Sequence, residues 1–146
     1  TDKVFMVNDG VSAGSNEIAL QIVEDGTISI DLNDAVVISG LRTISTGQWN
    51  HLVITRSGSS LKLFVNGSQD PNTGTDGTAL SFGTCYLMIG TDDDSATPCA
   101  RTTLNDFMDG RIDDFKIFNF ALTPTQINTL YNQGSSVRFG PQTGSP

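Results

Sequence analysis

The densest group of side chains with a possible chemistry is a run of three aspartates, Asp92-Asp93-Asp94, which lies between Cys85 and Cys99. Carboxylate oxygens on a loop are ligands that calcium accepts. The alternative is a solvated loop of mutually repelling charges, because the spacing and closing Glu of an EF-hand are absent. Asp92 and Asp94 are candidate calcium ligands, and calcium is the cofactor that such a loop could bind.

Asp113 is the third candidate metal ligand. In an extended strand its side chain would share a face with Phe115 and Ile117, whereas Asp114 and Lys116 would take the other face. A carboxylate on an apolar face must be hydrogen-bonded or bound to a cation. The residues leave both options open at this position.

The chain has two cysteines, Cys85 and Cys99. No CxxC spacing and no nearby histidine accompanies them, so zinc binding is not expected. The pairing logic for exported domains favours a disulfide across the acidic loop over two separate buried thiols. Such a disulfide would contribute about 3 kcal/mol through loop entropy. It would also place the protein outside the cell or in the periplasm.

The chain lacks the side-chain pairs that hydrolysis needs. A glycosidase requires two carboxylates about 5 to 10 Å apart across the scissile bond. The only glutamates, Glu17 and Glu24, lie seven positions apart near turns. Asp109 and Asp113 are separated by a predicted turn or strand start. His51 is the single histidine and no Gly-x-Ser-x-Gly elbow is present. We predict a protein that is not an enzyme.

The amino-acid composition further narrows the class of protein. The 146 residues are 37% hydrophobic and 16% charged, enough for one domain with its own core. Fourteen Asp stand against two Glu and three Lys, a balance that favours turns and strands over helices. The formal charge of −8 argues against binding to nucleic acid or to an anionic membrane. No apolar run approaches the roughly 20 residues that span a bilayer.

Short apolar runs bounded by Gly, Asn and Asp recur along the chain, which is typical of strands in a sandwich or barrel. Asp25-Gly26 and Asn66-Gly67 predict tight hairpin turns, because a type I′ turn needs positive φ. The predicted strands lie at residues 4–7, 18–23, 27–32, 36–38, 51–55, 61–65, 79–82, 86–89 and 107–120.

One helix is predicted near the C-terminus. Thr123 is suited to cap it, Pro124 to open it, and Gln126 to complete a capping box. Ile127 begins the apolar face, and Gly134 is expected to end the helix. The sandwich domain is predicted to span residues 1–139, followed by a flexible tail at 140–146.

Three segments in order resemble the laminin-G-like, concanavalin A-like jelly-roll domains of the lectin and glucanase superfamily. They cover residues 47–67, with Trp49, His51 and Asn66-Gly67; residues 87–90; and residues 107–123, with the Gly-Arg-Ile-Asp-Asp run. The resemblance implies an all-β fold, a two-sheet antiparallel jelly-roll sandwich with one short C-terminal helix, and places Trp49 in the core. The Glu-x-Asp-x-Glu motif of related glucanases is absent.

The resemblance also shapes the functional expectation. Relatives usually carry additional N-terminal strands, so either the chain is trimmed or a strand from its own tail or from a neighbouring subunit completes the sheets. We expect an extracellular or cell-surface binding or adhesion module that recognises glycan or a cell-surface protein, with calcium assistance as an option. The alternative is a structural subunit of a surface filament or pilus-like assembly completed by strand exchange. No binding residue is singled out by the sequence.

Overall fold

The structure is a computed structural model that describes residues 2–7, 18–33, 35–79, 87–93, 100 and 102–136. The described strands, in chain order, are β1 (Asp2–Val7), β2 (Ile18–Ile22), β3 (Thr27–Leu32), β4 (Ala35–Thr43), β5 (Leu52–Ser57), β6 (Ser60–Val65), β7 (Ser68–Thr75), β8 (Leu87–Ile89), β9 (Asp92–Asp93) and β10 (Leu104–Asn105). The helix α1 (Pro124–Ser136) follows them.

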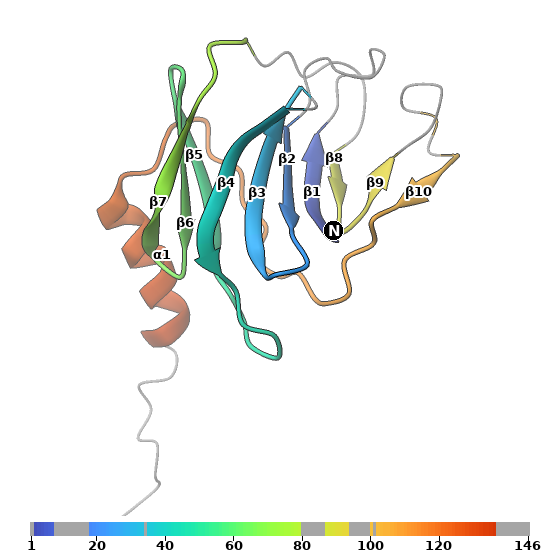
Figure 1. The fold of residues 1–146 in the computed structure, drawn as a ribbon. Coiled ribbons are helices and arrows are strands. Elements are labelled where there is room, and N and C mark those ends of the chain that lie inside the picture. Colours follow the sequence, from blue (N-terminus) through green and yellow to red (C-terminus); the bar gives the residue numbers. More distant parts are fainter. Residues whose placement is uncertain are drawn as a thin grey trace, which may run out of the picture.

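Two antiparallel sheets form the body of the molecule (Figure 1). The larger has five strands in the order β4-β3-β2-β1-β8, and the smaller has three in the order β5-β6-β7. β9 and β10 make a short ribbon beside them. The predicted all-β sandwich of two antiparallel sheets with one short helix is confirmed.

Both predicted hairpins form where their turn residues stand. Gly26, with φ of 80°, turns β2 into β3, and the Asp25 carboxylate accepts hydrogen bonds from the backbone and hydroxyl of Thr27 at 2.9 and 2.6 Å. Asn66 and Gly67, with φ of 51° and 77°, turn β6 into β7. Because positive φ is costly for most residues, these Asn, Asp and Gly positions fix where each hairpin turns.

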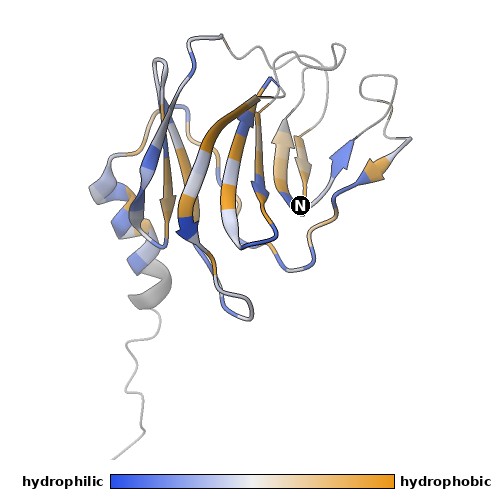
Figure 2. Cartoon of the chain, in the orientation of Figure 1, coloured by the Kyte–Doolittle hydropathy of each residue, from blue (hydrophilic) through white to orange (hydrophobic). Residues whose placement is uncertain are grey.

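The core lies between the two sheets and is supplied by alternate residues of β3 and β6. Figure 2 shows the resulting bands of hydropathy along β3. The buried core residues are Leu20, Ile28, Ile30, Leu32, Ile38, Leu61, Leu63 and Val65. Burial of this apolar surface is the main favourable term in folding.

The two sheets approach closely where β4 meets β7. A β-carbon on Gly40 would lie 2.7 Å from the Ile28 carbonyl oxygen. A β-carbon on Gly74 would lie 2.5 Å from Val37 and 2.9 Å from its carbonyl oxygen. Since both clashes include backbone atoms, a larger residue at position 74 would push β7 away from β4, and one at position 40 would push β4 away from β3.

The helix begins as its sequence predicts. The backbone N–H of Gln126 donates to the Thr123 hydroxyl at 3.3 Å, and the Gln126 side chain accepts from the Thr123 N–H at 2.8 Å. Ile127 is fully buried, as expected for the apolar face. The helix passes Gly134 and ends at Ser136, two residues later than predicted. Among the described residues, no helix is long and apolar enough to cross a membrane.

One predicted strand is absent. Residues 107–120 lie in neither helix nor strand, although their alternating pattern is that of a strand. We call residues 109–122 the Phe115 segment; in Figure 1 the segment passes behind the sheets on its way to α1. The prediction failed because a strand needs a neighbour for its backbone hydrogen bonds, and none of the described strands pairs with this segment.

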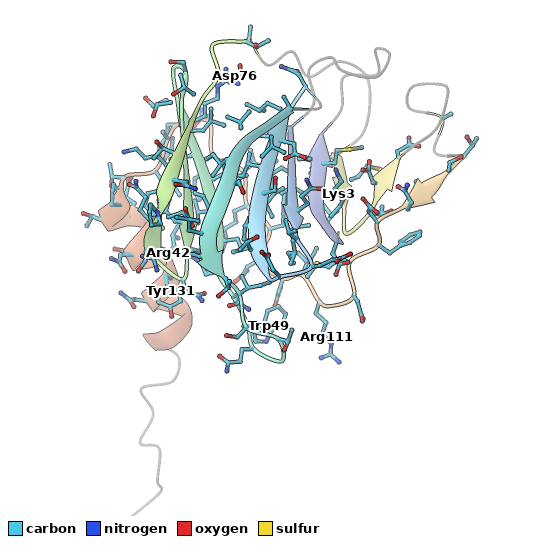
Figure 3. The ribbon with its side chains drawn as sticks, in the orientation of Figure 1. Lys3, Arg42, Trp49, Asp76, Arg111 and Tyr131 are labelled. Atoms are coloured by element: carbon cyan, nitrogen blue, oxygen red, sulfur yellow. The ribbon has the colours of Figure 1, made fainter. Side chains whose placement is uncertain are left out.

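Two other expectations are corrected. Ser68–Thr75 is not among the predicted strands, but it forms β7 against β6, because pairing with a neighbour outweighs low strand propensity. Trp49 was expected in the core, but it is 61% exposed in the loop before β5 (Figure 3). The core between the sheets is filled by aliphatic residues and leaves the indole outside.

Candidate functional site

A groove of about 380 Å³ lies between the end of β4 and the β6–β7 hairpin. We call it the Arg42 groove; it is lined by Leu41, Arg42, Thr43, Val65, Asn66 and Ser68. Cavities of this size suit a small ligand or one residue of a larger one. Arg42 is the charged side chain among the lining residues, so the chemistry of the groove centres on a guanidinium.

One edge of the Arg42 guanidinium is hydrogen-bonded to the backbone, and the other edge is open to a ligand. Its Nε donates to the Gln69 carbonyl oxygen at 2.9 Å. Within the described part of the chain, its two terminal nitrogens have no hydrogen-bond partner. Thr43 and Ser68 beside it are exposed and place two hydroxyls at the same opening. This arrangement offers a forked donor and two hydroxyls to a ligand that carries a carboxylate.

Asp70 fixes the backbone of the groove. The side chain is 1% exposed, and its Oδ2 accepts hydrogen bonds from the N–H groups of Leu41 at 3.0 Å and Arg42 at 2.8 Å. Its Oδ1 accepts from the N–H of Asn72 at 2.9 Å. One buried carboxylate of β7 therefore locks the strand residues that form the groove wall on β4. Pre-organisation of this kind lowers the entropic cost of binding.

The opposite wall is fixed by the Asn66 side chain. Its Oδ1 accepts from the backbone N–H of His51 at 2.8 Å, and its Nδ2 donates to the Asn50 side chain at 3.1 Å. Behind this turn, Gly67 packs so closely on Tyr131 of α1 that a β-carbon would lie 2.9 Å from the ring. Arg42 and Tyr131 lie at the same end of the molecule in Figure 3. The helix thus braces the hairpin that lines the groove.

His51 lies behind the same hairpin. Its ring is tilted on Tyr131 with centroids 5.9 Å apart, and its Nδ1 is buried without a hydrogen-bond partner among the described residues. Burial lowers the pKa of His51 below its ordinary value of 6.5, and the positive charge of Lys116 lowers it further. These contacts fit a packed structural role for His51.

Of the predicted metal ligands, the structure describes Asp92 and Asp113, which lie in different segments. Asp92 in β9 forms an ion pair with Lys3 of β1, whose Nζ lies 3.1 Å from its Oδ2. Because both side chains are largely buried, a cation at Asp92 would have to compete with the lysine. Asp113 is exposed on the Phe115 segment and accepts a hydrogen bond from the Asp114 N–H at 2.8 Å. The strand that was to place Asp113 on an apolar face is not formed.

The remaining predicted positions are Asp94, Cys85 and Cys99, which lie outside the described residues. The predicted disulfide and the tail at 140–146 therefore stay predictions. In the described part of the chain, no cluster of three or more His, Cys, Asp or Glu side chains is placed to hold a metal ion.

Sequence reasoning missed Arg42 and Asp70. Both stand in polar stretches where no motif singles them out, and they meet through a hydrogen bond from the Arg42 N–H to the Asp70 carboxylate that spans 28 positions. One signal was present in Asp70-Pro71-Asn72. The Asp70 carboxylate accepts a hydrogen bond from the N–H two residues later, and Asp is favoured in local turns of this kind.

The two sheets with their shared apolar layer define the chain as a jelly-roll β-sandwich. Residues 1–128 match Laminin_G_3, the concanavalin A-like lectin/glucanases superfamily, and the chain belongs to this family. The resemblance seen in the sequence is therefore confirmed.

The solved structures include one similar chain, the crystal structure of an S-layer domain-containing protein (residues 221–444) from Clostridium thermocellum. It is 22% identical with a TM-score of 0.46, and the alignment covers 88% of this chain and 62% of that one. The present chain thus spans less than two thirds of that structure. No curated protein matches.

Proposed function

We propose that this chain is a non-catalytic, extracellular or cell-surface binding module that recognises a glycan carrying a carboxylate. The observation that supports the proposal is the Arg42 groove, with its guanidinium held by Nε and open at both terminal nitrogens. The lectin-type family favours a glycan over other carboxylate ligands. A cell-surface protein that presents an acidic side chain is the competing partner.

The chemistry of the groove fits an acidic saccharide. A guanidinium fork binds a carboxylate by two parallel hydrogen bonds, which a lysine cannot reproduce. The hydroxyls of Thr43 and Ser68 match sugar hydroxyls, and the 63% exposed Leu41 offers an apolar surface to a ring face. The rest of the chain is acidic, so selectivity for an anion would come from Arg42 and not from the overall field.

Calcium remains part of the proposal as an assisting ion at Asp92, Asp94 or Asp113. Asp92 is balanced by Lys3, so calcium binding there would require the lysine to move. Asp113 is exposed and free of that competition. Adding a chelator in the binding experiment distinguishes a site that needs calcium from a site formed by protein side chains alone.

The test is an array of neutral and acidic saccharides probed with the purified chain, with and without chelator. We expect retention on carboxylate-bearing glycans and at least roughly tenfold weaker binding by Arg42→Gln, because a hydrogen-bonded ion pair is lost. Arg42→Lys should recover only part of the binding. Arg111→Gln, a change at an exposed arginine away from the groove, is the matched control. Binding to neutral glycans alone, or equal binding by Arg42→Gln, would refute the proposal.

A second candidate function is favoured by a different observation. The Phe115 segment exposes Ile117 by 74% and Phe120 by 56%, more apolar surface than an isolated domain usually leaves uncovered. A structural subunit of a surface assembly would cover this segment with a neighbour. Sedimentation or electron microscopy tests this candidate, because a chain that stays monomeric excludes it.

A further inference from the structure

The Phe115 segment has the side-chain pattern of a strand without the pairing of one. Apolar and charged residues alternate through Phe115, Lys116 and Ile117, yet the segment belongs to neither sheet. It is attached to the body at few points. The Phe115 ring meets the edge of Phe5 at 5.6 Å, and the Phe118 and Phe120 rings meet each other at 5.9 Å. Most of its apolar surface therefore has no partner among the described residues.

Its backbone takes part in neither sheet, although the N–H groups of Asp109 and Asp114 donate to the carboxylates of Asp2 and Asp113. Backbone bonding stops at the Met108 N–H, which donates to Gly90, and resumes at the Ile127 N–H, which donates to Thr123. Between them, residues 109–122 make no backbone–backbone hydrogen bond within the described chain. Extended backbone with free N–H and C=O groups is a template for another strand. An added strand would supply these hydrogen bonds and cover the apolar side chains together.

The charges of the segment restrict which strand can be added. If a second copy of the same segment pairs antiparallel about a two-fold axis, each residue must face a residue on the same side of the sheet. A residue of the segment must then lie opposite its own copy. Centres at Asp113, Asp114 or Lys116 would place like charges directly opposite each other, which is unfavourable. A centre at Ile117 would place Lys116 opposite an apolar residue.

A centre at Phe115 pairs the two charges next to the axis, Asp114 and Lys116, with each other, whereas a centre at Ile117 pairs neither of them. Phe115 then faces its own copy, and Asp114 faces Lys116 of the second copy on both sides of the axis. One step further out, Asp113 faces Ile117. Within one chain the Lys116 ammonium already lies 3.6 Å from the Asp114 carboxylate, on the exposed surface. Both side chains are thus available to exchange this contact for one across the axis.

We propose that two copies of the chain pair through residues 111–119 as antiparallel strands, with Phe115 on the two-fold axis. The proposal rests on the assembly candidate above, and it narrows that candidate to a closed pair, because a two-fold contact consumes the same surface on both copies. Asp114 has a φ of 54° in the single chain, so its backbone must become extended on pairing.

The test is a charge exchange followed by sedimentation equilibrium of the full chain. Asp114→Lys alone, or Lys116→Asp alone, turns two attractive pairs into two repulsive ones and should weaken dimerisation roughly tenfold. The double change Asp114→Lys with Lys116→Asp restores both pairs and should restore the dimer. Asp113→Lys is the matched control, because Asp113 faces an apolar residue in this register and its change should leave the dimer almost unaffected.

The outcomes distinguish the Phe115-centred pair from the broader assembly candidate. The side chains of Asp114 and Lys116 are 85% and 53% exposed, so the variants should fold, and thermal melting checks this. A chain that is monomeric at every concentration overturns both the pairing and the assembly candidate. Association that ignores the charge exchange, or that continues to open polymers, overturns the Phe115-centred pair and leaves the assembly candidate standing. Loss of Arg42-dependent glycan binding bears on neither.

Discussion

Strand β6 and the Phe115 segment carry a similar pattern of apolar side chains, but those of β6 are buried and those of the segment are exposed. In β6, Leu61, Leu63 and Val65 occupy alternate positions and are buried, and β5 and β7 pair with that strand on both edges. In the Phe115 segment, Phe115 and Ile117 alternate in the same way and are exposed. The difference lies in the neighbours and not in the pattern. A strand-like sequence becomes a strand only when another backbone satisfies its hydrogen bonds.

The sharpest way to test this contrast is to delete the same kind of side chain on both sides. Leu63→Ala removes a fully buried side chain and should lower the free energy of unfolding by about 3 kcal/mol through lost transfer energy and a residual cavity. Ile117→Ala removes a side chain that is 74% exposed and should change it by less than about 0.5 kcal/mol. Urea unfolding of dilute samples measures both. Equal effects would mean that the segment is packed in solution.

Asp70 gives a second, smaller contrast, between a carboxylate that organises backbone and one that does not. Asp70→Ala leaves the N–H groups of Leu41, Arg42 and Asn72 without their acceptor, and we expect a loss of about 2 kcal/mol in unfolding free energy. Asp113→Ala, at an exposed aspartate, should stay within about 0.5 kcal/mol.

The Asp70 comparison has an internal check. Asp70→Asn keeps one carbonyl oxygen and should fall between the wild type and Asp70→Ala. Amide hydrogen exchange at Leu41 and Arg42 should accelerate in the same order. Unchanged exchange in Asp70→Ala would show that solvent replaces the carboxylate without loss.

The elements that sequence predicted correctly depend on local chemistry. Gly26 and Asn66-Gly67 turn the chain because they adopt positive φ, Asp25 accepts hydrogen bonds from Thr27, and Thr123 with Gln126 caps α1 within one helical turn. Each of these signals acts over a few residues, so a single sequence carries it in full. The family resemblance then supplied the overall architecture, which local signals alone could not.

The failures depend on contacts far apart in the chain. β7 has few apolar residues and was missed, since its strand conformation comes from β6 and from its contact with β4. The Arg42 groove joins β4 to the β6–β7 hairpin through Asp70, and no spacing rule predicts such a junction. The strand predicted at residues 107–120 is the opposite case, because the apolar and polar residues alternate but no described strand pairs with them.

The smallest expected effect concerns His51, which connects the two sides, as it lies under Tyr131 and near Lys116 of the Phe115 segment. Burial first, and the charge of Lys116 second, lower its pKa in the folded chain below 6.5. The unfolded chain then binds more protons than the folded one at mildly acidic pH. Stability from neutral His51 is therefore fully present above pH 6.5 and declines as pH falls toward the lowered pKa.

The measurement is the unfolding free energy of the wild type and of His51→Gln from about pH 7.5 to about pH 5, a range that brackets the ordinary pKa of histidine. The wild type should lose stability on acidification, and the variant should lose less. Hydrogen bonds from Thr27 and Thr78 lower the pKa values of Asp25 and Asp76 below 3.8, so these carboxylates titrate outside that range. Lys116→Gln should raise the pKa of His51 and weaken the pH dependence. A wild type that gains stability on acidification would show that His51 is charged in the folded state, and that the Phe115 segment does not hold Lys116 beside it.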